Sequence, residues 1–406
     1  MTGWLKDKVP FSVKLFLKRQ RARFSSEKPP RNHKQFNTLR KHDASVIVFD
    51  EVLPTPDRDA GSARMFLILR FLARHYHTVF VYRTKVSDPR YEQSLWQEGI
   101  ETVDLIYYAQ VLKQQNFKAA IVSRPDLTHT LLQSLRKLAP QTKIIFDSVD
   151  AHYRRLEREY EVSGDDAVKR KADYYRKIEL EVVRGCDIIW CTSTEDEIAL
   201  KTETAGKPVA IIPTIHPLHD RGKAFVERRN LLFIGNFNHT PNRDAVEFFV
   251  EKILPQIHKS LPEVKLEVIG SNPPHHFQTY ASESVSIHGY VPDVEPFFQS
   301  TRVFVAPLRF GAGVKGKIGE ALSYGVPVVT TDVGAEGMRF EHGHQVLLGN
   351  APEDFAKYVV ETYTNPELWQ RLSDAGHAHV AKYFSPEAIE RVILNSLECG
   401  APAPLW

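Results

Sequence analysis

A glycine-rich segment in the last third of the chain holds the residues best suited to chemistry. Five of the 21 glycines lie within 15 residues, among them Gly311, Gly313 and Gly316, with Lys315 and Lys317 beside them. Glycine lets the backbone turn sharply or approach a ligand closely. A glycine loop that leads into a helix also presents free N–H groups at the positive end of the helix dipole. The segment therefore predicts a phosphate site with two ammonium groups.

The glycine spacing also matches the GxGxxG fingerprint of dinucleotide-binding loops. Asp332 lies 21 residues after Gly311, about where an acid would hold a ribose hydroxyl. The position of the loop argues against an NAD site. The dinucleotide fingerprint normally follows the first strand of its domain, whereas this loop follows the fourth apolar run of its half of the chain. Lys317 and Glu320, three apart and so on one helix face, are also unusual beneath a pyrophosphate.

Two sets of short apolar runs, separated by stretches of helical periodicity, must position this loop. Such alternation is typical of βα units and a parallel sheet, so we expect an α/β protein with two Rossmann-like doubly wound domains. The predicted strands of the first set are 45–52, 78–82, 119–123, 143–147, 187–192 and 209–213. Those of the second set are 230–235, 264–270, 285–291, 302–308, 326–331 and 345–349. Open α/β sheets bind ligands at their carboxyl ends, which places the function between the domains.

The same pattern predicts the domain boundaries. The predicted segments are a basic tail (1–44), a first domain (45–215), a linker (216–229), a second domain (230–385) and a C-terminal helix (386–406). Ser385 is the predicted N-cap of that helix, and Ile389, Val392, Ile393 and Leu397 form an apolar face that must pack on something, which we expect to be the first domain. The charge-dense stretch 154–161 is typical of a solvated helix face.

The formal net charge of +3 is unevenly distributed. Residues 1–41 hold 12 Lys and Arg against 2 Asp and Glu, and the rest of the chain holds 41 against 48. Aromatic and apolar residues lie among these charges, which suits an anionic membrane surface, with a solvated or domain-packing arm as the alternative; we expect no nucleic-acid partner. No apolar run suits a transmembrane helix or a secretory signal. Three cysteines without metal-ligand spacing favour a reducing, cytoplasmic location, with the protein peripheral at the membrane's cytoplasmic face.

Residues 310–331, Phe-Gly-Ala-Gly-Val-Lys-Gly-Lys-Ile-Gly-Glu-Ala-Leu-Ser-Tyr-Gly-Val-Pro-Val-Val-Thr-Thr, resemble the donor-site signature of glycosyltransferase family 4. Members of that family are retaining, metal-independent enzymes of the GT-B fold. Supporting motifs occur in both halves of the chain, at 54–64, 147–157, 233–237, 241–245, 289–293 and 334–337. The resemblance therefore covers roughly residues 45–400 and excludes the basic tail.

The resemblance implies a role for each matching residue. Glu320 would hold the ribose hydroxyls, Lys315 or Lys317 would neutralise the charge of the departing diphosphate, and His152 would sit at the donor sugar. The implied catalytic residues are His152, Lys317 and Glu320. The implied substrate-binding residues are Gly61, Ser62, Arg64, Gly235, Asn236, Gly289, Tyr290, Val291, Gly311, Gly313, Val314, Lys315 and Glu336. Among them, residues 289–291 would frame the base, and residues 61–64 would close the site from the first domain.

The chain departs from the family pattern at two positions. Ala312 stands where the family usually has a first glutamate, and Asn236 stands where many members have an arginine. We predict a glycosyltransferase that moves a sugar from a nucleotide-diphosphate sugar to a glycan or lipid-linked polysaccharide precursor, with retention of configuration. Asp57-x-Asp59 could bind a metal but also suits a helix cap, and we expect no metal or cofactor. An inactive nucleotide-sugar-binding subunit, or an NAD-dependent oxidoreductase, remains the alternative.

Overall fold

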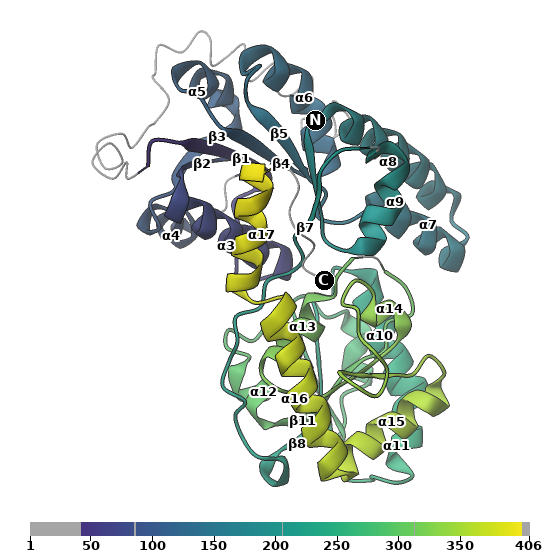
Figure 1. Ribbon diagram of the computed structural model, residues 1–406. Helices are drawn as coiled ribbons and strands as arrows, with labels where there is room; N and C mark the ends of the chain where they lie inside the picture. Colours follow the sequence, from purple (N-terminus) through teal and green to yellow (C-terminus); the bar gives the residue numbers. More distant parts are fainter. Residues whose placement is uncertain (1–41, 85–86, 205, 312, 400–406) are drawn as a thin grey trace.

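The computed structural model describes residues 42–84, 87–204, 206–311 and 313–399, and Figure 1 shows that they form two α/β bodies, one above the other. The basic tail and Ala312 lie outside the described residues. Within the described part of the chain, no helix combines the length and apolar character needed to cross a membrane.

The first body is built on a seven-stranded parallel sheet with the order β3-β2-β1-β4-β5-β6-β7. Its strands are β1 (Ser45–Val52), β2 (His77–Thr84), β3 (Glu101–Asp104), β4 (Ala119–Ser123), β5 (Lys143–Asp147), β6 (Ile188–Cys191) and β7 (Val209–Ile211). Its helices are α3 (Ala60–His75), α4 (Pro89–Gln97), α5 (Tyr108–Gln114), α6 (Pro125–Leu138), α7 (His152–Ser163), α8 (Asp166–Gly185) and α9 (Thr194–Thr204), with a 3₁₀ turn η1 (Leu105–Tyr107).

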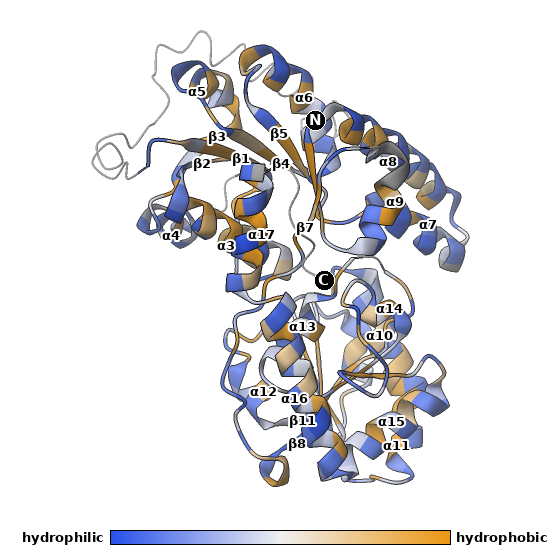
Figure 2. Cartoon of the chain, in the orientation of Figure 1, coloured by the Kyte–Doolittle hydropathy of each residue, from blue (hydrophilic) through white to orange (hydrophobic). Residues whose placement is uncertain are grey.

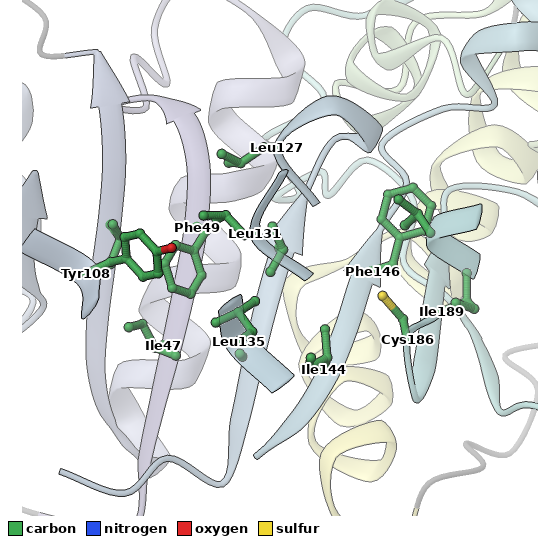
Figure 3. Close-up of a cluster of buried hydrophobic side chains, with 14 of the residues drawn as sticks. Ile47, Phe49, Tyr108, Leu127, Leu131, Leu135, Ile144, Phe146, Cys186 and Ile189 are labelled. Atoms are coloured by element: carbon green, nitrogen blue, oxygen red, sulfur yellow. The ribbon is translucent and has the colours of Figure 1, made fainter. Parts of the chain in front are cut away.

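Both faces of this sheet are buried, which explains why its central strands are nearly continuous apolar runs. Ile47 and Phe49 of β1 pack on one face with residues of α5, α6 and α8, a cluster that includes Leu131 (Figure 3). Val46 and Val48 face the opposite way and pack on α3. Figure 2 shows these strands as an apolar layer between amphipathic helices.

The edge strand β3 was not predicted from the sequence. Its residues Glu101-Thr-Val-Asp include only one buried side chain, that of Val103. A short edge strand needs little apolar surface, so its sequence carries little signal of its pairing with β2.

The second body is a six-stranded parallel sheet with the order β10-β9-β8-β11-β12-β13, and all six predicted runs form its strands. The strands are β8 (Arg229–Ile234), β9 (Leu266–Ile269), β10 (Val285–Gly289), β11 (Thr301–Ala306), β12 (Val328–Thr330) and β13 (Leu347–Leu348). The helices are α10 (Thr240–Phe248), α11 (Leu254–His258), α12 (Glu295–Ser300), α13 (Gly316–Ser323), α14 (Asp332–Ala335), α15 (Pro352–Thr364) and α16 (Pro366–Tyr383). Short helical turns are η2 (Phe225–Glu227), η3 (Phe249–Ile253) and η4 (His275–Thr279).

The last helix, α17 (Pro386–Cys399), leaves the second body and packs on the first, as Figure 1 shows. Ile389, Ile393 and Leu397 are buried in the core cluster that contains α3 and one face of the first sheet. The indole of Trp190 in β6 donates to the hydroxyl of Ser396 at 3.1 Å. The second domain is therefore followed by a helix that completes the core of the first.

The carboxyl edges of the two sheets face each other. Loops that follow strands of the first sheet contact loops that follow strands of the second: a methyl added at Gly313 would lie 3.5 Å from the Cβ of Asp150, and one at Gly337 would lie 2.8 Å from the Cβ of Ser193. The carboxyl end of a parallel sheet is where α/β proteins bind ligands, and these ends of the two sheets therefore face each other.

Candidate active site

The glycine loop runs from the end of β11 to the start of α13. Gly311 and Gly313 have φ values of 133° and 72°, a region that side chains disfavour. Gly316, the first residue of α13, lies so close to α3 that an added methyl would be 2.6 Å from the Cβ of Ala60. Glycines at these positions thus let the loop turn and let the first domain approach it.

The two lysines of the loop are largely buried. The ammonium of Lys315 donates to the carbonyl of Gly313 at 2.5 Å, and burial lowers its pKa to about 8. The ammonium of Lys317 donates to the side-chain oxygen of Asn242 and lies 4.4 Å from the ring centre of Phe233. Burial and the nearby Lys315 lower the pKa of Lys317 to about 7. An anion bound beside the two lysines would favour their charged forms and so raise the pKa of both groups.

Glu320 lies one turn after Lys317 on α13. Burial raises its pKa to about 7. Among the residues that the structure describes, none donates a hydrogen bond to its carboxylate, although two oxygens can accept several. The side chain is therefore available to hydroxyl groups of a ligand.

His152 is the first residue of α7 and stands at the carboxyl edge of the first sheet. Its Nδ1 lies 2.6 Å from a carboxylate oxygen of Asp150, and its ring packs 5.2 Å from that of Tyr175. Burial disfavours the charged imidazole, but the Asp150 carboxylate outweighs that penalty and raises the pKa of His152. Glu179 accepts the backbone N–H groups of His152 and Tyr153, both at 2.9 Å, and so holds the start of the helix. With Nδ1 bound to Asp150, Nε2 is left for a ligand.

The structure places Arg64 in the core of the first domain. Its guanidinium donates to both carboxylate oxygens of Asp147, at 3.0 and 2.9 Å, and its Nε donates to the carbonyls of Ile212 and Pro213. The residue is 3% exposed. Arg64 therefore ties α3 to β5 and β7 in the core, and its predicted contact with substrate stays a prediction.

Gly61 and Ser62 stand in the first turn of α3. Asp59 caps this helix, because its carboxylate accepts the N–H of Ser62 at 2.8 Å. Asp57 accepts the hydroxyl of Tyr91 at 3.0 Å. The acidic pair is thus engaged in capping and hydrogen bonding, and within the described residues no group of three His, Cys, Asp or Glu side chains could hold a metal ion.

The residues predicted to frame the base lie at the carboxyl end of β10, and the predicted substrate-binding residues Gly235 and Asn236 follow β8. Gly289 has a φ of 68°, and Tyr290 is 50% exposed, ahead of the partly buried Val291. Gly235 lies against Lys317, whose ammonium would be 3.0 Å from an added methyl. The side chain of Asn236 accepts the N–H of Asn238 at 2.9 Å, so it shapes the turn.

Sequence reasoning missed Arg158. This residue of α7 forms two contacts with the carboxylate of Glu336, at 2.5 and 2.8 Å, across the domain interface. The stretch 154–161 was expected to be a solvated face, because charges of both signs alternate there. The one available signal was that this helix starts at His152 and so begins inside the site.

A family comparison covers the half of the site that carries the glycine loop. Residues 228–365 match the model of the family described as "Glycosyl transferases group 1". The part of the chain that resembles this family is the second domain. This domain holds the glycine loop, both lysines and Glu320, in agreement with the predicted family.

Solved structures that resemble this chain cover both of its domains. Sucrose-phosphate synthase from Thermosynechococcus elongatus has a TM-score of 0.65 at 16% identity, over 85% of this chain and 96% of that one. Anabaena Alr3699/HepE in complex with UDP has a TM-score of 0.65 at 11% identity, over 87% and 100%. A glycosyltransferase from Rickettsia africae has a TM-score of 0.63 at 11% identity, over 88% and 99%. The likeness confirms the predicted GT-B fold.

A curated relative is the uncharacterized 44.6 kDa protein in cps region of Klebsiella pneumoniae. It is 27% identical over 164 residues, which are 38% of this chain. The match spans 42% of that relative's length.

Proposed function

We propose that this protein is a glycosyltransferase that moves a sugar from a nucleotide-diphosphate sugar to an acceptor, with retention of configuration and without a metal. One observation carries the proposal: the glycine loop of the group 1 domain meets the Asp150–His152 segment of the other domain, with 3.5 Å between a Cβ at Gly313 and that of Asp150. Anion-binding groups and a histidine held by a carboxylate thus converge from two domains. The solved complexes of HepE with UDP and with UDP-glucose favour a uridine nucleotide.

The protein would act by positioning the donor and stabilising its leaving group. Glu320 would accept hydrogen bonds from the ribose hydroxyls. The ammonium of Lys317 and the N–H groups of the loop would balance the charge that develops on the departing nucleoside diphosphate. His152, oriented through Nδ1 by Asp150, would present Nε2 to the donor sugar.

We infer that the acceptor is a glycan or a lipid-linked polysaccharide precursor. The basic, partly aromatic segment 1–41 supports this choice, because such a segment suits the anionic cytoplasmic face of a membrane, where a lipid-linked acceptor would be presented.

Calorimetric titration with UDP, GDP, ADP, CMP, dTDP and NAD(H), with and without EDTA, tests the donor class. We expect one nucleoside diphosphate to bind regardless of EDTA. Glu320→Ala should weaken it roughly thirtyfold, since hydrogen bonds to a charged group contribute about 2 kcal/mol. Glu263→Ala, which removes an exposed glutamate of the same domain, is the matched control. Binding of NAD(H) alone would show that the loop is a dinucleotide site.

His152→Ala tests the role of the histidine. Turnover of the donor should fall by about 100-fold or more while nucleotide affinity changes little, because His152 would act at the sugar and not at the nucleotide. Steady-state kinetics and calorimetry on the same variant separate the two effects. Nucleotide binding by the wild type without any donor turnover would instead identify an inactive partner subunit.

A further inference from the structure

Helix α7 of the first domain places a guanidinium on the glycine loop of the second. Arg158 contacts both carboxylate oxygens of Glu336, and its Nη1 also donates to the carbonyl of Gly311 at 2.9 Å. The Glu336 side chain is 10% exposed and that of Arg158 is 27% exposed, so the pair is shielded from water. One residue of the first domain thus holds both a carboxylate that follows β12 and a carbonyl inside the phosphate loop.

A second cation holds the next glycine of the loop. The ammonium of Lys315 donates to the carbonyl of Gly313, and it lies 3.9 Å from Glu336. In a planar trans peptide unit the C=O and N–H bonds point in opposite directions. Holding the Gly313 carbonyl against Lys315 therefore aims the N–H of Val314 to the opposite side, where an anion can accept it.

Glu336 is the acceptor for which the two cations compete. If Arg158 were absent, the buried carboxylate would be left with Lys315 as its cation, and an unpaired buried charge is costly. The ammonium would then move from the Gly313 carbonyl to Glu336, and the loop would lose the contact that orients it. The bidentate bond to Arg158 opposes this movement, since it already supplies the Glu336 carboxylate with a cation and two hydrogen bonds.

We propose that Arg158 is a positioning residue for the donor diphosphate: by occupying Glu336, it keeps Lys315 on the Gly313 carbonyl and so presents the N–H of Val314 to the phosphate. The inference rests on the proposed function. Since Arg158 belongs to the first domain and Glu336 to the second, the contacts of Arg158 with Glu336 and Gly311 form only when the domains are together. Domain closure and diphosphate binding therefore favour each other.

Calorimetric titration of UDP, GDP, ADP and dTDP into five proteins tests this role: the wild type, Arg158→Ala, Glu336→Gln, the double variant and Arg154→Ala. Arg154 is the matched control, a partly buried arginine of the same helix that donates to the carbonyl of Glu195 in its own domain. Arg158→Ala should weaken the bound nucleotide roughly tenfold or more, and Arg154→Ala by less than about twofold.

The double variant decides the mechanism. Glu336→Gln removes the carboxylate that competes for Lys315, so adding it to Arg158→Ala should restore affinity to within about threefold of the wild type. A purely structural role for the Arg158–Glu336 pair would leave the double variant as weak as Arg158→Ala. Unfolding midpoints of all variants exclude loss of fold, and Arg158→Lys, which keeps a cation but not the bidentate bond, should lie between wild type and Arg158→Ala.

The outcomes separate this inference from the function on which it rests. If no nucleotide binds the wild type, the proposed function fails and the inference with it. If a nucleotide binds the wild type and Arg158→Ala equally, or if the double variant shows no recovery, the transferase proposal stands and the role of Arg158 is wrong.

Discussion

The ammonium group of Lys317 is largely buried, and its surroundings disfavour its positive charge. Its pKa is lowered to about 7 by burial and by Lys315, and it donates to the side chain of Asn242. Glu320, one turn away, has its pKa raised to about 7 by burial. The two groups change charge in the same pH range but favour different parts of a nucleotide.

A pH titration of affinity should separate these two groups. Above pH 7, Lys317 of the unliganded protein loses its proton. Binding of a diphosphate favours the charged ammonium, so the protein must take up a proton when UDP binds. The affinity for UDP should therefore fall by up to about tenfold per pH unit between pH 7 and 9. The affinity for uridine, which lacks the diphosphate, should instead rise between pH 7 and 9, because Glu320 becomes a carboxylate. Calorimetry in buffers of different ionisation enthalpy measures the proton uptake. Lys317→Met should make the UDP profile shallower, with the remaining slope due to Lys315, whose pKa is lowered to about 8 by burial. An unchanged profile would contradict the assignment.

Helix α17 shows how an element placed last in the chain can complete the first domain. Its N-cap, Ser385, accepts the N–H of Ala388 at 3.3 Å. Ile389 and Ile393 are fully buried in the core that α3 shares with the first sheet. The apolar face was evident in the sequence, but the surface that it covers lies about 300 residues earlier in the chain.

Truncating a buried residue of α17 should therefore destabilise the first domain. We expect Ile393→Ala to cost about 2 to 5 kcal/mol, the usual range when a fully buried isoleucine is replaced by alanine. Urea unfolding followed by circular dichroism measures the change, with Asn395→Ala on the exposed side of the same helix as the control. Equal effects of the two substitutions would show that α17 contributes little to the core.

For the molecule as a whole, the concentration of positive charge in residues 1–41 suggests how the enzyme meets its acceptor. We expect the full chain to float with vesicles of acidic phospholipid and a form lacking residues 1–41 to remain unbound. Rising salt should weaken the binding, because each exposed basic residue near an anionic surface contributes about 1 kcal/mol that ions screen. Vesicles of neutral phospholipid are the control. Equal flotation of the two forms would refute the membrane proposal.

Local pattern was enough to predict most of the fold and the glycine loop of the candidate site. Twelve predicted strands are present. The central ones were the easiest to predict, because a strand buried on both faces must be apolar whatever its partners are. The glycine loop was predictable because its constraints require glycine. The positive φ of Gly313 disfavours a side chain there, and the approach of Ala60 leaves no room for one at Gly316.

The roles of the arginines depended on the folded arrangement. Arg64 lies in a motif typical of a substrate site, yet its guanidinium turns into the core to meet Asp147, a partner 83 residues away. Arg158 lies in a stretch typical of a solvated helix, yet it meets Glu336 across 178 residues. A long charged side chain on a helix has the same sequence pattern whether it faces water, a core or another domain. Its role is settled by the long-range packing of the two sheets, which local composition does not encode.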